Sequence, residues 1–259
     1  MRVFIEGIGL VGPGLENWPA ARPVLAGAKP YEPAPVRLQP ITLLPPAERR
    51  RSGMTVKLAI AAGVEALAQA GRDAIDMPMV FAASGGDGET LHETLAVLAT
   101  QQREVSPTRF HNSVHNAPSG YWAVATGSRV PNVSLSAFDE TFAAGLLEAA
   151  VQATVNDHPV TLIAYDVPYP EPLQAVRPMA AVFGVALVLS PQRTDRALAA
   201  LTIALPDTVS DGTRMVDAAL EQLRLANPAA RALPLLAAIA RGDTAAIYLD
   251  GIDMIVAPP

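Results

Sequence analysis

A polar stretch near the middle of the chain, residues 110–147, holds most of the side chains that could do chemistry. His111, Ser113 and His115 stand close together, and Asp139 follows further on. Loops rich in His, Asn and Ser between apolar elements are where sites are usually built. A serine nucleophile, a histidine base and a carboxylate would suit an acyl hydrolase or a decarboxylase.

The local context of these residues gives that chemistry little support. Ser113 does not lie in a Gly-x-Ser-x-Gly sequence, the motif that exposes a serine nucleophile at a strand-to-helix turn. His111 and His115 are spaced to share one face of a helix, as paired zinc ligands do. However, Asn112 replaces the glutamate of a His-Glu-x-x-His motif, and a third ligand would have to be His92 or a distant carboxylate. We therefore predict no metal and no cofactor, and expect these side chains to hydrogen-bond loop backbone and helix ends.

Two aromatic residues, Tyr121 and Trp122, follow Gly120 on a helix that the pattern extends to Thr126. Such a pair packs either in a core or at an interface. Aromatic residues make up only 5% of this chain, so a Tyr-Trp pair beside a polar loop mildly favours an interface.

The apolar patterns predict alternating strands and helices around this stretch. Strands are expected over residues 2–8, 77–83, 160–165, 180–189, 198–205, 245–249 and 254–257, with a further buried strand in the central stretch, between its two helices. Helices are expected over residues 44–70, 89–102, 142–154, 213–225 and 228–241, and residues 19–46 read as a proline-rich loop. This order predicts a layered α/β/α protein.

Gly7, Gly9 and Gly12 form a Gly-x-Gly-x-x-Gly match after the first strand. A dinucleotide site needs a helix to open inside these glycines, but Pro13 and Gly14 follow instead. We therefore expect these three glycines to form a tight turn and not a dinucleotide site.

Composition excludes several classes of function. The net charge of −6 and the isoelectric point near 5.2 argue against nucleic acid as a partner, and the only basic cluster is residues 49–51. The absence of cysteine excludes disulfides, thiolate metal sites and a cysteine nucleophile. No apolar run is long enough to span a membrane and no signal peptide is visible, so we expect a cytoplasmic protein.

Several segments resemble β-ketoacyl synthases. VFIEGIGLVGPGL is similar to the opening strand of that family, and ERRRSGMTVKLAIAAGVEALAQAG to its first long helix. NAPSGYWAVATGSRVPNVSLSA resembles the Asn-x-x-Ala-Gly helix and the Gly-x-Arg-Gly-Pro strand that lead to the active cysteine. The resemblance implies a thiolase-like fold in one domain, with residues 1–190 as the N-terminal ketosynthase half and 191–259 as a shortened C-terminal part.

The family's nucleophile is missing from this sequence. Counting from Asn116, Gly120 and Pro131, the cysteine position falls on Asp139, and Glu140 begins the segment that replaces the following glycine-rich turn. No histidine follows His158, so the two catalytic histidines of the family's second half are also absent. The resemblance therefore implies a catalytically silent relative.

A more specific resemblance is to the short chain-length-factor proteins of aryl polyene and related gene clusters. It rests on FHNSVHNAPSGYW, SLSAFDETFAAGLLEA, AYDVPYPEPL and NPAARALPLLAAIARG. It implies a heterodimer with an active ketosynthase, leaves room for a contact with an acyl carrier protein, and implies that residues of this chain shape the acyl tunnel. The candidate tunnel or interface residues are Phe110, His111, Ser113, His115, Asn116, Tyr121, Trp122, Phe138, Asp139 and Phe142. The alternatives are an independent acyl-thioester hydrolase or decarboxylase, and a homodimeric binding protein without catalysis.

Overall fold

The computed structural model describes residues 1–206 and 210–259. Within these residues the apolar runs form one mixed sheet of eight strands. The strands are β1 (Arg2–Val11), β2 (Met79–Ala82), β3 (Asn132–Leu135), β4 (Val160–Asp166), β5 (Phe183–Ser190), β6 (Ala199–Ala204), β7 (Ala245–Leu249) and β8 (Ile252–Ala257). Their order is β3-β2-β4-β5-β1-β6-β8-β7. Strands β3, β2 and β4 run parallel, and all other neighbouring pairs are antiparallel.

Helices cover both faces of this sheet, because the inner strands are apolar on both sides. The helices are α1 (Trp18–Leu25), α2 (Pro46–Arg51), α3 (Met54–Ala70), α4 (Gly88–Leu98), α5 (Pro107–Asn112), α6 (Ala117–Thr126), α7 (Thr141–Asn156), α8 (Leu173–Val176), α9 (Ala218–Ala226) and α10 (Leu233–Arg241). Two 3-10 turns, η1 (Phe138–Glu140) and η2 (Pro228–Ala232), precede α7 and α10.

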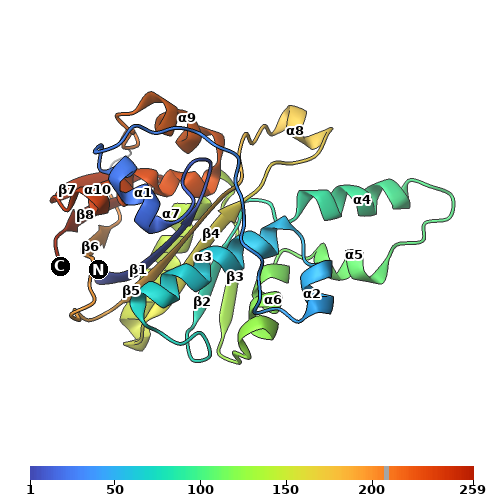
Figure 1. The fold of residues 1–259 in the computed structure, drawn as a ribbon, viewed down its shortest axis with the longest axis horizontal. Coiled ribbons are helices and arrows are strands. Elements are labelled where there is room, and N and C mark those ends of the chain that lie inside the picture. The colour runs from blue at the N-terminus through green and yellow to red at the C-terminus, as the bar shows by residue number, and fades with distance from the viewer. Residues whose placement is uncertain (207–209) are drawn as a thin grey trace.

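Strand β4 shows how the sheet separates two apolar cores. Leu162 and Ala164 pack into the core that holds α1, α7 and α10, whereas Ile163 and Tyr165 pack into the core that holds α3 and α6. Figure 1 shows α3 lying along one face of the sheet, and α4 and α5 projecting from one end of the molecule. The predicted layered α/β/α architecture is confirmed.

Two of the three Gly-x-Gly-x-x-Gly glycines have a different role from the one expected, whereas Gly12 does lie at a tight turn, where it exchanges backbone hydrogen bonds with Leu15. Gly7 and Gly9 lie inside β1, which continues to Val11, and not in a turn. A Cβ atom on Gly9 would lie 1.9 Å from the carbonyl oxygen of Ala62, and one on Gly7 would lie 2.1 Å from that of Ala66. These glycines therefore let α3 approach the backbone of β1.

The proline-rich region also contains a helix that the pattern did not predict. Helix α1 begins after Asn17, whose side chain accepts a hydrogen bond from the backbone N–H of Ala20. Pro19 lies in the first turn, where its missing N–H costs no intrahelical bond. The prediction of a loop over residues 19–46 is wrong for this part.

The helix predicted over residues 44–70 is broken at Ser52 and Gly53, which have extended backbone between α2 and α3. A side chain at residue 53 would meet Asp87, whose carboxylate accepts a hydrogen bond from the Thr55 hydroxyl. Other boundaries also differ from the prediction. Helix α4 ends at Leu98, α9 begins only at Ala218, and the helix predicted over 228–241 begins as a 3-10 turn.

Candidate functional site

The three parallel strands end together and place polar residues side by side. In the register of the sheet Ala82 is opposite both Leu135 on β3 and Ala164 on β4. The residues that follow these positions therefore meet at one edge of the sheet. They include Ser84 after β2, Asp166 at the end of β4, and the segment 136–139 after β3. In layered α/β proteins this edge is where sites are usually built.

Asp139 lies in the short turn η1 between β3 and α7. Its Oδ1 accepts a hydrogen bond of 3.0 Å from Nη2 of Arg177, and its Oδ2 lies 3.9 Å from Nη2 of Arg231. The preceding residue, Phe138, has a φ of 53°, a backbone region that costs free energy for a residue with a bulky side chain. The carboxylate at the predicted nucleophile position is thus ion-paired, on a strained strand-to-helix turn.

The two arginines have further partners of their own. The Cζ atom of Arg177 lies 3.6 Å from the ring centroid of Phe138, a cation–π contact. Nη1 of Arg231 donates to Oδ1 of Asp250, in the turn between β7 and β8. The ion pairs therefore join the turn after β3, the loop before β5, η2 and the β7–β8 turn.

Asp166 is the buried acid of this edge. It is only 4% exposed, and its Oδ1 accepts hydrogen bonds from the backbone N–H and the hydroxyl of Ser84. Its Oδ2 is buried without a hydrogen-bond partner among the described residues. Burial raises the pKa of Asp166 to about 7, although the Ser84 hydrogen bonds and the positive charge of Arg177 oppose the shift.

The histidine segment lies on α5 and in the turn before α6. His111 is exposed and its ring meets that of Tyr121 edge to face, with centroids 6.1 Å apart. Nε2 of His115 lies 2.9 Å from the carbonyl oxygen of Ala83. The Ser113 hydroxyl donates to the carbonyl of Phe110 at the end of α5.

The helix face that a pair of zinc ligands would share is not formed by these histidines, because α5 ends at Asn112 and His115 lies in the turn before α6. The hydrolase triad is not assembled either. In the described part of the chain, Ser113, the two histidines and Asp139 each have other partners and make no hydrogen bond to one another.

The other candidate residues divide into core and surface. Tyr121, Trp122 and Phe142 are 3%, 0% and 0% exposed, and belong to the core of this chain. The Tyr121 hydroxyl donates to Oδ1 of Asn112, whose amide in turn donates to the carbonyl of Arg51. On the surface, Phe110 and Phe138 are 65% and 62% exposed, and Asn116 is exposed at the start of α6.

Three residues of the site were not found from the sequence. Asp166 could have been recognised as an acid ending a buried strand beside two other parallel strands. Arg177 and Arg231 carried no such signal, because Arg177 lies in the loop after α8 and Arg231 in the 3-10 turn η2, and only the folded chain brings both next to Asp139.

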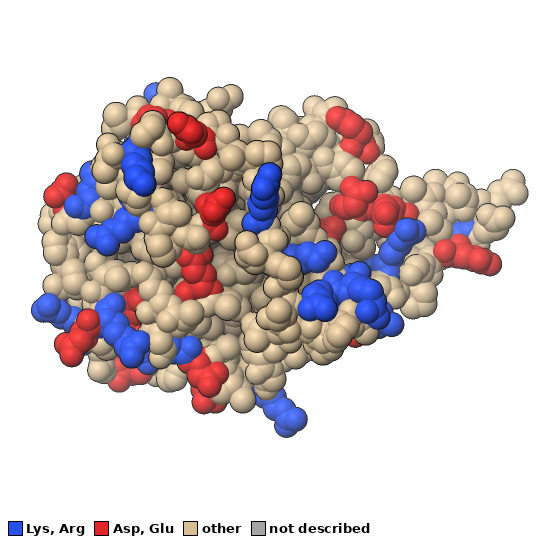
Figure 2. Space-filling model, viewed as in Figure 1, with Lys and Arg blue, Asp and Glu red and all other residues tan. Residues whose placement is uncertain are grey.

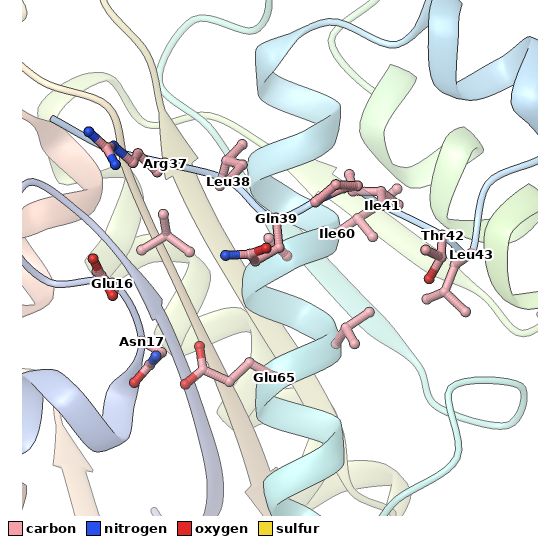
Figure 3. Close-up of a pocket in the computed structure, with 14 residues that line it drawn as sticks. Glu16, Asn17, Arg37, Leu38, Gln39, Ile41, Thr42, Leu43, Ile60 and Glu65 are labelled. Carbon is pink, nitrogen blue, oxygen red and sulfur yellow. The ribbon is translucent and has the colours of Figure 1, made fainter.

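A cavity lies beside α3, near the end of β1. It has a volume of about 330 Å³, between α3 and residues 37–43 (Figure 3). Glu65 faces it, but the two oxygens of this carboxylate accept the backbone N–H groups of Trp18 and Leu10. Burial raises the pKa of Glu65. This carboxylate therefore anchors α3 to β1 and to the start of α1.

Charges of both signs are scattered over the face shown in Figure 2, with basic side chains grouped over α2, where residues 49–51 lie. None of the helices in the described ranges is both long enough and apolar enough to cross a membrane.

Comparisons with solved structures agree with this architecture. A chain in the complex of the ketosynthase ApeO with its chain length factor ApeC, from Xenorhabdus doucetiae, superposes with a TM-score of 0.73 at 21% identity, and the match covers 99% of both chains. A chain of the ishigamide ketosynthase/chain length factor gives 0.70 at 15% identity, covering 99% of this chain and 98% of that one. A β-ketoacyl synthase from Burkholderia phymatum gives 0.59 at 14% identity, over 88% of this chain and 70% of that one.

Among curated proteins no sequence matches this chain. Residues 18–245 do match the family described as β-ketoacyl synthase, N-terminal domain. With most of its length matched and its fold shared with ketosynthase structures, this chain belongs to the β-ketoacyl synthase family.

Proposed function

We propose that this chain is a catalytically silent, ketosynthase-like subunit of the chain-length-factor type. It pairs with an active ketosynthase in aryl polyene, or related polyketide or fatty-acid, chain elongation. The observation that carries the proposal is the ion pair between Asp139 and Arg177 at the position where the family motif puts the nucleophile.

Acyl transfer in this family needs a thiolate to take the acyl chain, and a chain without cysteine cannot supply one. The carboxylate of Asp139 is no substitute. Its two oxygens face guanidinium groups, which compete for the lone pairs that an attack on a thioester would use. The reacting thiolate would then come from the partner.

The outermost strand of the sheet, β3, supports pairing with another chain. Strand β3 is the last strand of the sheet and, within the described ranges, hydrogen-bonds only to β2. An edge strand with free backbone groups is a template for a strand from a partner. Val133 and Leu135 on this strand are only partly buried, so a partner would find apolar side chains to cover.

The projecting helices present further apolar surface at the same end of the molecule (Figure 1). Leu91, Leu95 and Leu98 recur at helical spacing on α4 and are 43%, 55% and 44% exposed. Phe110 on the neighbouring α5 is 65% exposed. Solved relatives of the same fold include ketosynthases in complex with chain length factors, which supports a ketosynthase as the occupant of this surface.

The test is co-expression with the ketosynthase encoded nearest to this chain, followed by size-exclusion chromatography with mass detection. We expect a one-to-one complex, and condensation of acyl and malonyl carrier-protein substrates only when both subunits are present. Separate elution of a well-behaved 27.1 kDa monomer or of a homodimer would contradict the proposal. Thioester hydrolysis by the isolated chain, lost in Ser113→Ala, would favour the hydrolase instead.

A further inference from the structure

Asp139 lies between two arginine side chains that are better buried than it is. The side chain of Asp139 is 45% exposed, whereas those of Arg177 and Arg231 are 19% and 21% exposed. Oδ1 of Asp139 faces the guanidinium group of Arg177, and Oδ2 faces that of Arg231. The aspartate therefore lies on the solvent side of two partly buried guanidinium groups.

The arginines would keep their positions if this carboxylate were removed. The flat face of the Arg177 guanidinium stacks on the ring of Phe138, at 3.6 Å. Arg231 is held by Asp250, whose side chain is 15% exposed. Because neither contact involves the Asp139 side chain, the two guanidinium groups keep other partners when it is removed, and such preorganisation lowers the cost of binding an anion between them.

We propose that Arg177 and Arg231 form a carboxylate-binding cradle that Asp139 fills from within the chain. Guanidinium groups match the planar geometry of carboxylates, so the cradle should accept a small free carboxylate, such as acetate or malonate, once Asp139 is removed. The inference concerns the chain by itself and stands or falls independently of any ketosynthase partner.

The experiment is thermal unfolding of the purified chain and of Asp139→Ala, with sodium acetate or sodium malonate titrated against sodium chloride at equal ionic strength. We expect Asp139→Ala to unfold about 2–4 °C below the parent chain in chloride, the shift that about 1 kcal/mol produces in a chain of this size. Acetate and malonate should restore the melting temperature in Asp139→Ala and leave the parent chain unchanged, because its cradle is already occupied.

Glu140→Ala is the matched control. It removes the same charge from the neighbouring residue, which is exposed and makes no side-chain capping bond. Its melting temperature should neither fall in chloride nor rise when acetate or malonate is added. A second variant, Asp139→Ala combined with Arg177→Ala, should no longer respond to carboxylates. The proposal is overturned if acetate stabilises Glu140→Ala equally, if the double variant still responds, or if Asp139→Ala binds no carboxylate in a calorimetric titration with malonate.

Discussion

Asp166 and Ser84 join the carboxyl ends of β4 and β2. Oδ1 of Asp166 accepts the backbone N–H of Ser84 at 2.8 Å and its hydroxyl at 2.7 Å. The Ser84 carbonyl in turn accepts a hydrogen bond from the Ser136 hydroxyl, just after β3. One buried acid thus connects the three strands whose ends form the candidate site.

This acid should make stability depend on pH. Burial raises the pKa of Asp166 from 3.8 to about 7 in the folded chain. Between about pH 4 and pH 7 the unfolded chain therefore binds fewer protons here than the folded chain does. The contribution of Asp166 to the free energy of unfolding is fully present below pH 4 and is lost as pH rises to 7. The free energy of unfolding falls over this range by at most about 1.4 kcal/mol per pH unit.

Urea unfolding of the parent chain and of Asp166→Asn across this range checks the prediction. Other buried acids such as Glu65 contribute equally to both proteins, so the difference between the two curves isolates Asp166. Curves that stay parallel from pH 4 to pH 7 would show that this residue does not titrate as expected.

Gly9→Ala should destabilise the fold, because the new methyl group would collide with the backbone of α3 at Ala62. Overpacking of this kind costs about 1–3 kcal/mol or more, since a backbone carbonyl cannot turn away as a side chain can. Gly120→Ala is the control, because α6 leaves open space around Gly120 and alanine favours a helix. Chemical denaturation should show a lower midpoint for the first variant only.

Asn227→Ala should also destabilise the chain. The Asn227 amide donates to the carbonyls of Asp166 and Ala181, and its Oδ1 accepts the N–H of Ala229. The side chain is 1% exposed, so its loss leaves buried groups without partners, at about 1–3 kcal/mol for each. Asn227→Asp should not restore the stability, because its second carboxylate oxygen would face the same two carbonyl oxygens in a buried site. Equal unfolding free energies for Asn227→Ala and the parent chain would contradict this account.

Phe110→Ala separates a role at an interface from a role in the core. The ring is 65% exposed, so the unfolding free energy should change by no more than about 0.5 kcal/mol. In the reconstituted complex we expect weaker association or a changed product length. Val155→Ala, on an exposed position at the end of α7, should change neither. An unchanged complex and product for Phe110→Ala would remove this residue from the tunnel wall.

Much of the fold could be predicted from the sequence, because it depends on local patterns. The apolar runs over residues 160–165 and 180–189 became β4 and β5 with boundaries shifted by a few residues. Gly71 ends α3 in the left-handed conformation that favours glycine, and Asp250 and Gly251, both with positive φ, form the turn of the β7–β8 hairpin. These elements are specified by periodicity and by turn residues close to them in the chain.

The parts that could not be predicted depend on distant contacts. The break between α2 and α3 follows from the approach of Asp87 to Gly53, which no local pattern reveals. The predicted buried strand became the half-buried edge strand β3, because its position in the sheet depends on the strand order. The ion pairs of Asp139 depend on residues 38 and 92 positions further along the chain.

The open edge of β3 also bears on how the protein is produced. Free backbone donors and acceptors on such a strand pair with any exposed strand, including one from a second copy or from a partly folded chain. A chain that folds with this strand uncovered is therefore at risk of aggregation. If the chain pairs with a ketosynthase as proposed, matched synthesis of the two subunits, with assembly soon after folding, would keep that edge covered.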